Sequence, residues 1–173
     1  MKIVFDLDGV IRSLNDYFKI NYSINYPQVW YWKHKGKGFW DWCDIDKHMA
    51  PLNAPPTKYL PVIKKYCTEI WTDQPVYWRL KTRKWVRKHI GRCRIRYMNT
   101  AEKRARLDKE PDTLLIEDCP NFTRYNRIIL IDWRYNRHIK EPVRVKTPKQ
   151  LEHWLRLATG GKHARVQNRR NKR

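Results

Sequence analysis

The chain has 173 residues, the size of one ordinary domain with room for a modest insertion. Hydrophobic residues make up 41% of it, which is enough for a single core and argues against a wholly disordered chain. The 38 Lys and Arg residues outnumber the 17 Asp and Glu residues, for a formal net charge of +21. Such a charge attracts polyanions, so phosphorylated metabolites, nucleic acids and acidic membranes are all candidate partners.

The four cysteines, at positions 43, 67, 93 and 119, lack metal-finger spacing and are expected to be reduced, buried thiols. No apolar run approaches the length of a membrane span. The first ten residues, MKIVFDLDGV, have the pattern of a strand and not of a signal peptide. These features predict a cytoplasmic protein with no membrane segment.

Short apolar runs alternate with helical patterns along the chain. Continuous apolar runs of this length are typical of strands that are buried on both faces of a parallel sheet. The predicted strands are Lys2–Leu7, Thr68–Thr72, Arg94–Met98, Thr113–Glu117 and Ile128–Asp132. Helices are predicted at Lys58–Cys67, at Val76–Ile90 and after the capping box Thr147–Gln150. The alternation favours an α/β fold with a Rossmann-like, mostly parallel five-stranded sheet flanked by helices, built from residues 1–12 and 57–158.

Residues 13–56 interrupt this rhythm with a high density of aromatic side chains. We expect a small cap insertion after the first strand. Its aromatic residues either form the core of the cap itself or offer a surface on which bases stack. For the second interpretation, the candidate contacts are Phe18, Trp30 and Trp32.

Two basic segments are candidates for binding DNA or RNA. The helix predicted at 76–90 carries Arg83 and Lys84 among other cations, and either tracks a polyanion or presents a solvated face. The segment 159–173 is predicted to be a disordered basic tail that includes Arg169 and Arg170. The tail either contacts nucleic acid or only solubilises the chain.

Asp6 and Asp8 end the first predicted strand. Residues two apart on a strand project from the same face, so both carboxylates can address one site, and Gly9 then permits a sharp turn. Ligands of open α/β sheets bind beyond the carboxyl ends of the strands. Two adjacent acids repel each other unless they share a cation or a proton, which points to a divalent metal.

Other predicted strands end in residues that are suited to bind phosphate or a divalent cation. The hydroxyl of Thr72 and the helix start that follows it suit phosphate oxygens. Glu117 and Asp118 end a later strand and are suited to share a hard cation with the first pair. Lys103 lies between these elements.

The chain thus carries the pair Asp6/Asp8, then Thr72, then Lys103, then the pair Glu117/Asp118. In this order the four features resemble the motifs of the haloacid dehalogenase (HAD) superfamily of phosphohydrolases. Within the superfamily, the 5'(3')-deoxyribonucleotidases are the most similar. The likeness rests on Thr72–Gly91, Leu114–Asp118 and Ile131–Arg137, and it covers residues 1–12 and about 57–158.

The resemblance implies a mechanism and a role for each matching residue. Asp6 attacks phosphorus and forms an aspartyl-phosphate, while Asp8 acts as general acid and then general base. Mg²⁺ is held by Asp6, Asp8 through its backbone carbonyl, and Asp118. Thr72 and Lys103 bind the transferring phosphoryl group.

Three positions depart from the pattern of the nucleotidases. Asp73 replaces a usual Ser. Glu117 replaces the first Asp of the acidic pair and is assigned to the second shell of the metal. Lys103 lies 14 positions before Glu117, which leaves Lys109 as an alternative.

The sequence therefore predicts a magnesium-dependent hydrolase of phosphate monoesters, with a (deoxy)nucleoside monophosphate as the expected substrate. One alternative is a phosphatase that acts on phosphorylated DNA or RNA ends, which the charge and the small cap favour. Another is a catalytically idle HAD fold that serves as a nucleic-acid-binding component, which the basic tail favours and the intact Asp6/Asp8 pair disfavours.

Overall fold

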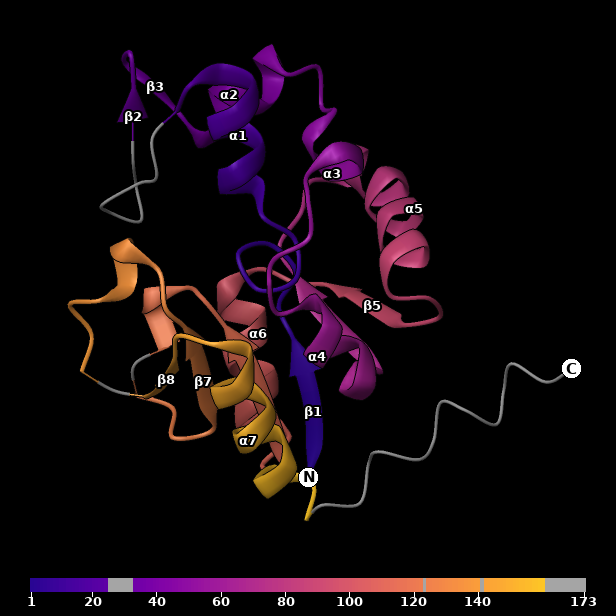
Figure 1. Ribbon diagram of the computed structural model, residues 1–173, viewed down its shortest axis with the longest axis vertical. Helices are drawn as coiled ribbons and strands as arrows, with labels where there is room; N and C mark the ends of the chain where they lie inside the picture. The colour runs from indigo at the N-terminus through magenta and orange to yellow at the C-terminus, as the bar shows by residue number, and fades with distance from the viewer. Residues whose placement is uncertain (25–32, 123, 141, 161–173) are drawn as a thin grey trace, which may run out of the picture.

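The computed structural model describes residues 1–24, 33–122, 124–140 and 142–160, and its central element is a parallel β-sheet (Figure 1). Within these residues the sheet has six strands in the order β5-β4-β1-β6-β7-β8, and every neighbouring pair is parallel. The strands are β1 (Lys2–Phe5), β4 (Glu69–Thr72), β5 (Arg94–Tyr97), β6 (Thr113–Glu117), β7 (Ile128–Ile131) and β8 (Val143–Val145). The predicted α/β, Rossmann-like fold is confirmed.

The sheet is one strand wider than the sequence predicted. The additional strand, β8, pairs with β7 through the register Ile129↔Val143 and Ile131↔Val145. It has only three residues, and Arg144 occupies its centre. A run of three residues with Arg at its centre is too short for a recognisable strand pattern, so its strand conformation depends on pairing with β7.

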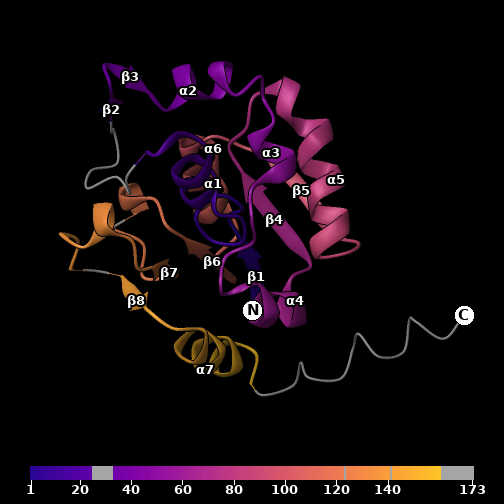
Figure 2. The ribbon, with the colours of Figure 1, turned by 45° about the horizontal axis from the view of Figure 1, so that its top comes forward.

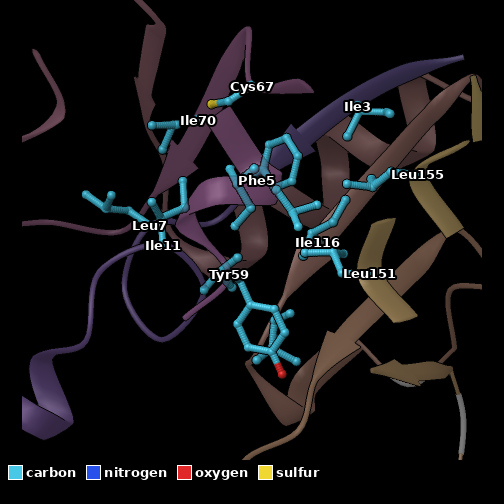
Figure 3. Packing of buried hydrophobic residues seen from close by; sticks show 14 of the residues in the cluster. Ile3, Phe5, Leu7, Ile11, Tyr59, Cys67, Ile70, Ile116, Leu151 and Leu155 are labelled. Atoms are coloured by element: carbon cyan, nitrogen blue, oxygen red, sulfur yellow. The ribbon is translucent and has the colours of Figure 1, made fainter. Parts of the chain in front are cut away.

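Helices cover both faces of the sheet. One face packs against α4 (Leu60–Tyr66), α5 (Arg79–His89) and α7 (Pro148–Ala158). Figure 3 shows Phe5 and Ile116 of the sheet beside Leu151 and Leu155 of α7. The opposite face packs against Leu107 of α6 (Thr100–Lys109) and the segment that follows β6. Because side chains on both faces are buried, Ile3–Phe5 of β1, Leu114–Ile116 of β6 and all of β7 are continuous apolar runs.

The predicted helices form where the sequence placed them. The 3₁₀ turn η1 (Val76–Trp78) leads directly into α5, so together they span most of the predicted 76–90 helix. At α7, the Thr147 hydroxyl accepts from the Gln150 amide, and the Gln150 side chain accepts from the Thr147 amide. This reciprocal pair is the predicted capping box. None of the helices in the described ranges is long and apolar enough to cross a membrane.

The segment after β1 forms a small helical layer beyond the carboxyl end of the strand (Figures 1 and 2). It contains α1 (Leu14–Tyr22), the hairpin β2 (Lys33–His34) and β3 (Lys37–Gly38), α2 (Phe39–Ile45) and α3 (Ala50–Asn53). Its own apolar cluster includes Phe18 and Trp42, and it also takes in Trp78 from η1. We call this layer the cap.

Phe18 does not contact solvent, because only 1% of its surface is exposed and its ring packs edge-on against Tyr17 and Phe39. The choice of Phe18 as a substrate contact was therefore wrong, and its place in the core of the cap supports the other interpretation of the aromatic residues. Trp30 and Trp32 lie outside the described residues, as do Arg169 and Arg170 and the rest of 161–173.

Candidate active site

Three adjacent strands end at the same edge of the sheet and bring four candidate residues together. β1 lies between β4 and β6. Asp6 directly follows β1, Thr72 ends β4, and Glu117 and Asp118 lie at the end of β6. Parallel strands place their carboxyl ends side by side, so residues over a hundred positions apart in sequence line one pocket.

Lys103 reaches this edge from the first turns of α6. The helix begins with a capping box in which Asn99 accepts from the Glu102 amide and Glu102 accepts from the Asn99 amide. This capping box fixes where α6 begins, so the Lys103 side chain points inward. Its Nζ donates to Asp6 Oδ1 at 2.6 Å and to Glu117 Oε2 at 2.9 Å. The competing candidate, Lys109, is exposed at the other end of α6.

Asp6, Glu117 and Asp118 form a buried acidic cluster. One carboxylate oxygen from each lies within 4.8 Å of the others, and each residue is at most 5% exposed. Burial, followed by the charge of Glu117, raises the pKa of Asp6 and of Asp118. Burial alone would lower the pKa of Lys103, but Asp6 and Glu117 raise it, so its ammonium group stays charged at neutral pH. One cation thus faces three acids, and a divalent ion would relieve the remaining repulsion.

Neighbouring groups already occupy both oxygens of Glu117. Oε2 accepts from Lys103, and Oε1 accepts from the backbone amides of Asp118 and Cys119 at 3.1 and 3.3 Å. This arrangement suits a residue that orients Lys103 and the loop after β6, and the assignment of Glu117 outside the direct metal ligands stays a prediction. In the described part of the chain, the Asp6 carboxylate accepts hydrogen bonds through Oδ1 alone.

Asp118 is held by residues from the segment after β7. The Tyr135 hydroxyl donates to Asp118 Oδ2, and the Asn136 amide donates to the Asp118 carbonyl at 2.8 Å. Asn136 is in turn fixed by Arg144 of β8. Strand β8, which the sequence did not predict, therefore supports Asp118, a residue of the predicted metal site.

The hydroxyl of Thr72 is buried at the end of β4. Only 1% of the residue is exposed, and among the described residues Oγ1 makes no hydrogen bond. Thr72 also lines the pocket with Asp6 and Lys103. An unpaired buried hydroxyl costs free energy, so the position favours a ligand oxygen that would satisfy it.

Asp8 lines the same pocket, but its carboxylate is bound by residues outside the acidic cluster. Arg12 donates to both of its oxygens, at 2.6 and 2.9 Å, and Gln74 donates at 2.5 Å. Arg12 is fully buried and also donates to the Pro51 carbonyl, so it ties Asp8 to the cap. A role for the Asp8 carboxylate in proton transfer therefore requires its ion pair with Arg12 to open.

The pocket above the acidic cluster has a volume of about 370 Å³ and lies between the sheet edge and the cap. Its polar floor contains Asp6, Thr72, Lys103 and Asp118. Its upper wall contains Phe39, Trp40 and Trp78, whose rings lie 4.8 to 6.3 Å apart between centroids. Trp40 is 51% exposed, so one of these rings is accessible to a ligand.

The aromatic wall and Arg12 were both missed as functional residues. Trp40 was visible as part of the aromatic-rich insertion, but the sequence does not reveal which of its rings faces the site. Arg12 had a weak signal, because an Arg four residues after Asp8 is within reach of it across one turn of chain. Arg83 and Lys84 are exposed on α5 and do not line the pocket.

Gly9 is required by the close approach of the first turn to Asp118. Its φ is +83°, and a Cβ atom built there would collide with the Asp118 carboxylate. We therefore expect Gly9→Ala to lower the free energy of unfolding by more than the roughly 1–3 kcal/mol that a strained backbone conformation costs. Gly91→Ala is the control, since Gly91 has a φ of +103° but nothing within 4 Å of such a Cβ. Urea unfolding of both variants measures the difference, and equal losses would contradict the packing of Gly9 on Asp118.

No protein-family model matches the sequence, and no curated protein matches it either.

Proposed function

We propose that this chain is a magnesium-dependent phosphohydrolase that cleaves a phosphate monoester through an aspartyl-phosphate on Asp6. One observation supports it above all others: a buried lysine lies 2.6 Å from Asp6 in a pocket that also holds two further buried acids and the unpaired Thr72 hydroxyl. A carboxylate nucleophile, a fixed cation and a free donor are the groups that phosphoryl transfer needs.

The donor set fits Mg²⁺. Magnesium prefers carboxylate and carbonyl oxygens and is usually bound by one or two carboxylates together with substrate oxygens and waters. Asp6 and Asp118 would hold the ion, with the backbone carbonyl of Asp8 as a third protein ligand. When bound, the ion would offset charge on the phosphoryl oxygens and favour the ionised state of the two acids.

The protein residues would then act in two steps. An Asp6 oxygen attacks phosphorus, the bond to the ester oxygen breaks, and the leaving oxygen takes a proton from Asp8. Water next attacks the aspartyl-phosphate, gives its proton to Asp8, and releases inorganic phosphate with Asp6 restored. Lys103 and Thr72 hold the phosphoryl oxygens throughout. The ion pair between Asp8 and Arg12 must open for the proton transfers.

The aromatic wall of the pocket supports a nucleoside monophosphate as substrate. With the phosphate on the polar floor, the rest of the substrate would extend toward Phe39, Trp40 and Trp78. A nucleobase offers a flat face that stacks on an aromatic ring. A cytoplasmic location, where such nucleotides occur, stays a prediction.

Trp40→Ala tests this placement of the base. Loss of one stacking contact costs about 1–3 kcal/mol, so KM for nucleoside monophosphates should rise about tenfold. KM for an aliphatic phosphate monoester should change little. Trp154→Ala is the control, because Trp154 is 38% exposed on α7 and does not line the pocket. Equal changes for both kinds of substrate would show that Trp40 does not contact the base.

A phosphate-release screen tests the function itself. Full-length protein is incubated with nucleoside 5'- and 3'-monophosphates and with aliphatic phosphate monoesters, with Mg²⁺ or with a chelator. We expect release with Mg²⁺ that the chelator abolishes. Release that is equal with the chelator would contradict the metal site, and no release from any ester would contradict the hydrolase.

A further inference from the structure

The region that follows β4 carries an unusual local charge. Positions 74 to 101 contain nine Lys and Arg residues and no Asp or Glu. This stretch includes η1, α5 and β5, so its charge is concentrated on one helix and one edge strand of the sheet.

Only part of this charge is available to a partner. Arg79 lies over the ring of Tyr97, 4.6 Å from its centroid, and Lys81 donates to the His48 carbonyl at 2.9 Å. The remaining cations of α5 are exposed and, among the described residues, form no salt bridge. They are Arg83, Lys84, Arg87 and Lys88, and we call them the α5 cations.

Cations elsewhere on the surface are often neutralised. Lys65 pairs with Glu152 at 3.0 Å, Arg106 with Glu110, and Arg137 with Asp132 at 2.8 Å. The α5 cations therefore differ from these in having no acid beside them.

Helix stability accounts for only part of the charge of the α5 cations. They lie at i and i+4 to one another, Arg83 with Arg87 and Lys84 with Lys88, and like charges at this spacing destabilise a helix. Arg87 and Lys88 gain from the negative end of the helix dipole in the last turn. Arg83 and Lys84 lie too far from that end to gain from it, so their charge favours an external anion.

The α5 cations are on the face opposite the core. Thr82, Trp85 and Val86 are the buried side of α5. The α5 cations lie within residues 83–88, which is about 7.5 Å of helix and can span about three phosphates at the roughly 3.4 Å spacing of a stacked strand. Its N-terminal end adjoins the pocket, because Trp78 lines the pocket and Arg79 begins the helix.

The exposed apolar residues of this region point to nucleic acid and not to lipid. They are confined to the end nearest the pocket, where Val76, Tyr77 and Leu80 are 73%, 54% and 60% exposed. A helix that lies on a membrane needs an apolar face along its length, and that face of α5 is buried in the core. Exposed rings and aliphatic groups beside cations are suited to unpaired bases.

We propose that the α5 cations form a docking surface for the sugar-phosphate backbone of single-stranded nucleic acid, whose phosphorylated end enters the pocket. The entry of the end rests on the proposed phosphohydrolase function, whereas the docking surface does not. On this proposal the substrate class extends from mononucleotides to oligonucleotides with a terminal phosphate.

The test compares two full-length variants that carry the same change in net charge. The first replaces the α5 cations by Gln, which keeps the helix. The second replaces four exposed cations elsewhere by Gln, at Lys109, Arg124, Lys146 and Lys149. Fluorescence anisotropy measures the Kd of each for single-stranded 12-mers of DNA and of RNA, with and without a terminal phosphate, at several salt concentrations.

Each phosphate contact contributes about 0.7 to the salt slope of binding to a single strand. With about three phosphates spanned, we expect the α5 variant to lose about 2 from the slope of log K against log salt, and to bind at least about tenfold more weakly at low salt. The control variant should remain near the wild type. Equal losses in both variants would show a response to net charge alone and would overturn the proposal. So would unchanged binding by the α5 variant, or wild-type protein that binds anionic phosphatidylserine vesicles but neither oligonucleotide.

Activity distinguishes this proposal from the function on which its second part rests. Hydrolysis of a mononucleotide should be unchanged in the α5 variant, while kcat/KM for the phosphorylated 12-mer should fall at least about tenfold through KM. If wild-type protein binds the 12-mer through α5 but releases phosphate from no ester, the docking surface stands and the hydrolase fails. If it hydrolyses mononucleotides but binds no 12-mer, the hydrolase stands and the docking surface fails.

Discussion

Asp6→Asn is expected to abolish phosphate release while the protein still folds. The substitution removes the nucleophile, and loss of a catalytic nucleophile reduces turnover by roughly 10⁴-fold or more. It also removes one of three mutually repelling buried acids, and Lys103 keeps its bond to Glu117 at 2.9 Å. The rate is measured by phosphate release with Mg²⁺, and folding by urea unfolding.

Asp112→Asn is the matched control, because Asp112 is exposed and does not line the pocket. It should have the wild-type rate. If Asp6→Asn releases phosphate at a near wild-type rate from any good substrate, the attack by Asp6 is wrong. If Asp6→Asn is unfolded, Asp6→Glu provides the second variant, which keeps the charge but displaces the attacking oxygen.

Lys103→Ala is expected to reduce the rate about a hundredfold or more. A cation that is fixed in a dry site and offsets charge in the transition state contributes several kcal/mol to catalysis, and each 1.36 kcal/mol is about tenfold in rate. The raised pKa of Lys103 keeps its ammonium charged through neutral pH, so this contribution should not fall off below pH 9. Steady-state kinetics with a nucleoside monophosphate measure the loss.

Lys109→Ala should change the rate little, because Lys109 is exposed at the end of α6. The reverse result would mean that the lysine of the site is six positions later than proposed. Removal of Lys103 also leaves Asp6 and Glu117 buried without their cation, which costs about 3–5 kcal/mol for a broken buried pair. Lys103→Gln keeps a donor there and separates the loss of charge from the loss of structure.

Most strands of the sheet could be predicted from the sequence, because the central strands are buried on both faces and therefore contain apolar runs. β6 has the predicted bounds, Thr113–Glu117. The observed bounds of β1, β4, β5 and β7 differ from the predicted ones by one or two residues. β8 was missed, since a strand of three residues around Arg144 owes its conformation to its neighbour. Helix α6 has no strong apolar periodicity, and Lys103 could be placed only between two strands.

The candidate site was predictable wherever strand order alone determines proximity. Asp6, Thr72 and Asp118 each follow or end a strand, and parallel pairing brings such ends together. The partners of Asp8 were not predictable, because Gln74 reaches it across 66 positions of chain and Arg12 depends on the path of the cap. The choice of Phe18 failed for a similar reason: an aromatic-rich segment does not reveal which rings form its core and which, like Trp40, face the pocket.

Detection of the covalent intermediate tests most directly whether Asp6 attacks phosphorus. Wild-type protein is mixed with a good substrate and Mg²⁺, quenched in acid within a turnover, and digested for peptide mass mapping. We expect a peptide containing Asp6 that gains the mass of one phosphoryl group, with the group placed on Asp6 by fragmentation. Asp6→Asn should show no such gain. Rapid turnover with no phosphorylated peptide, or a phosphoryl group on another residue, would contradict the attack by Asp6.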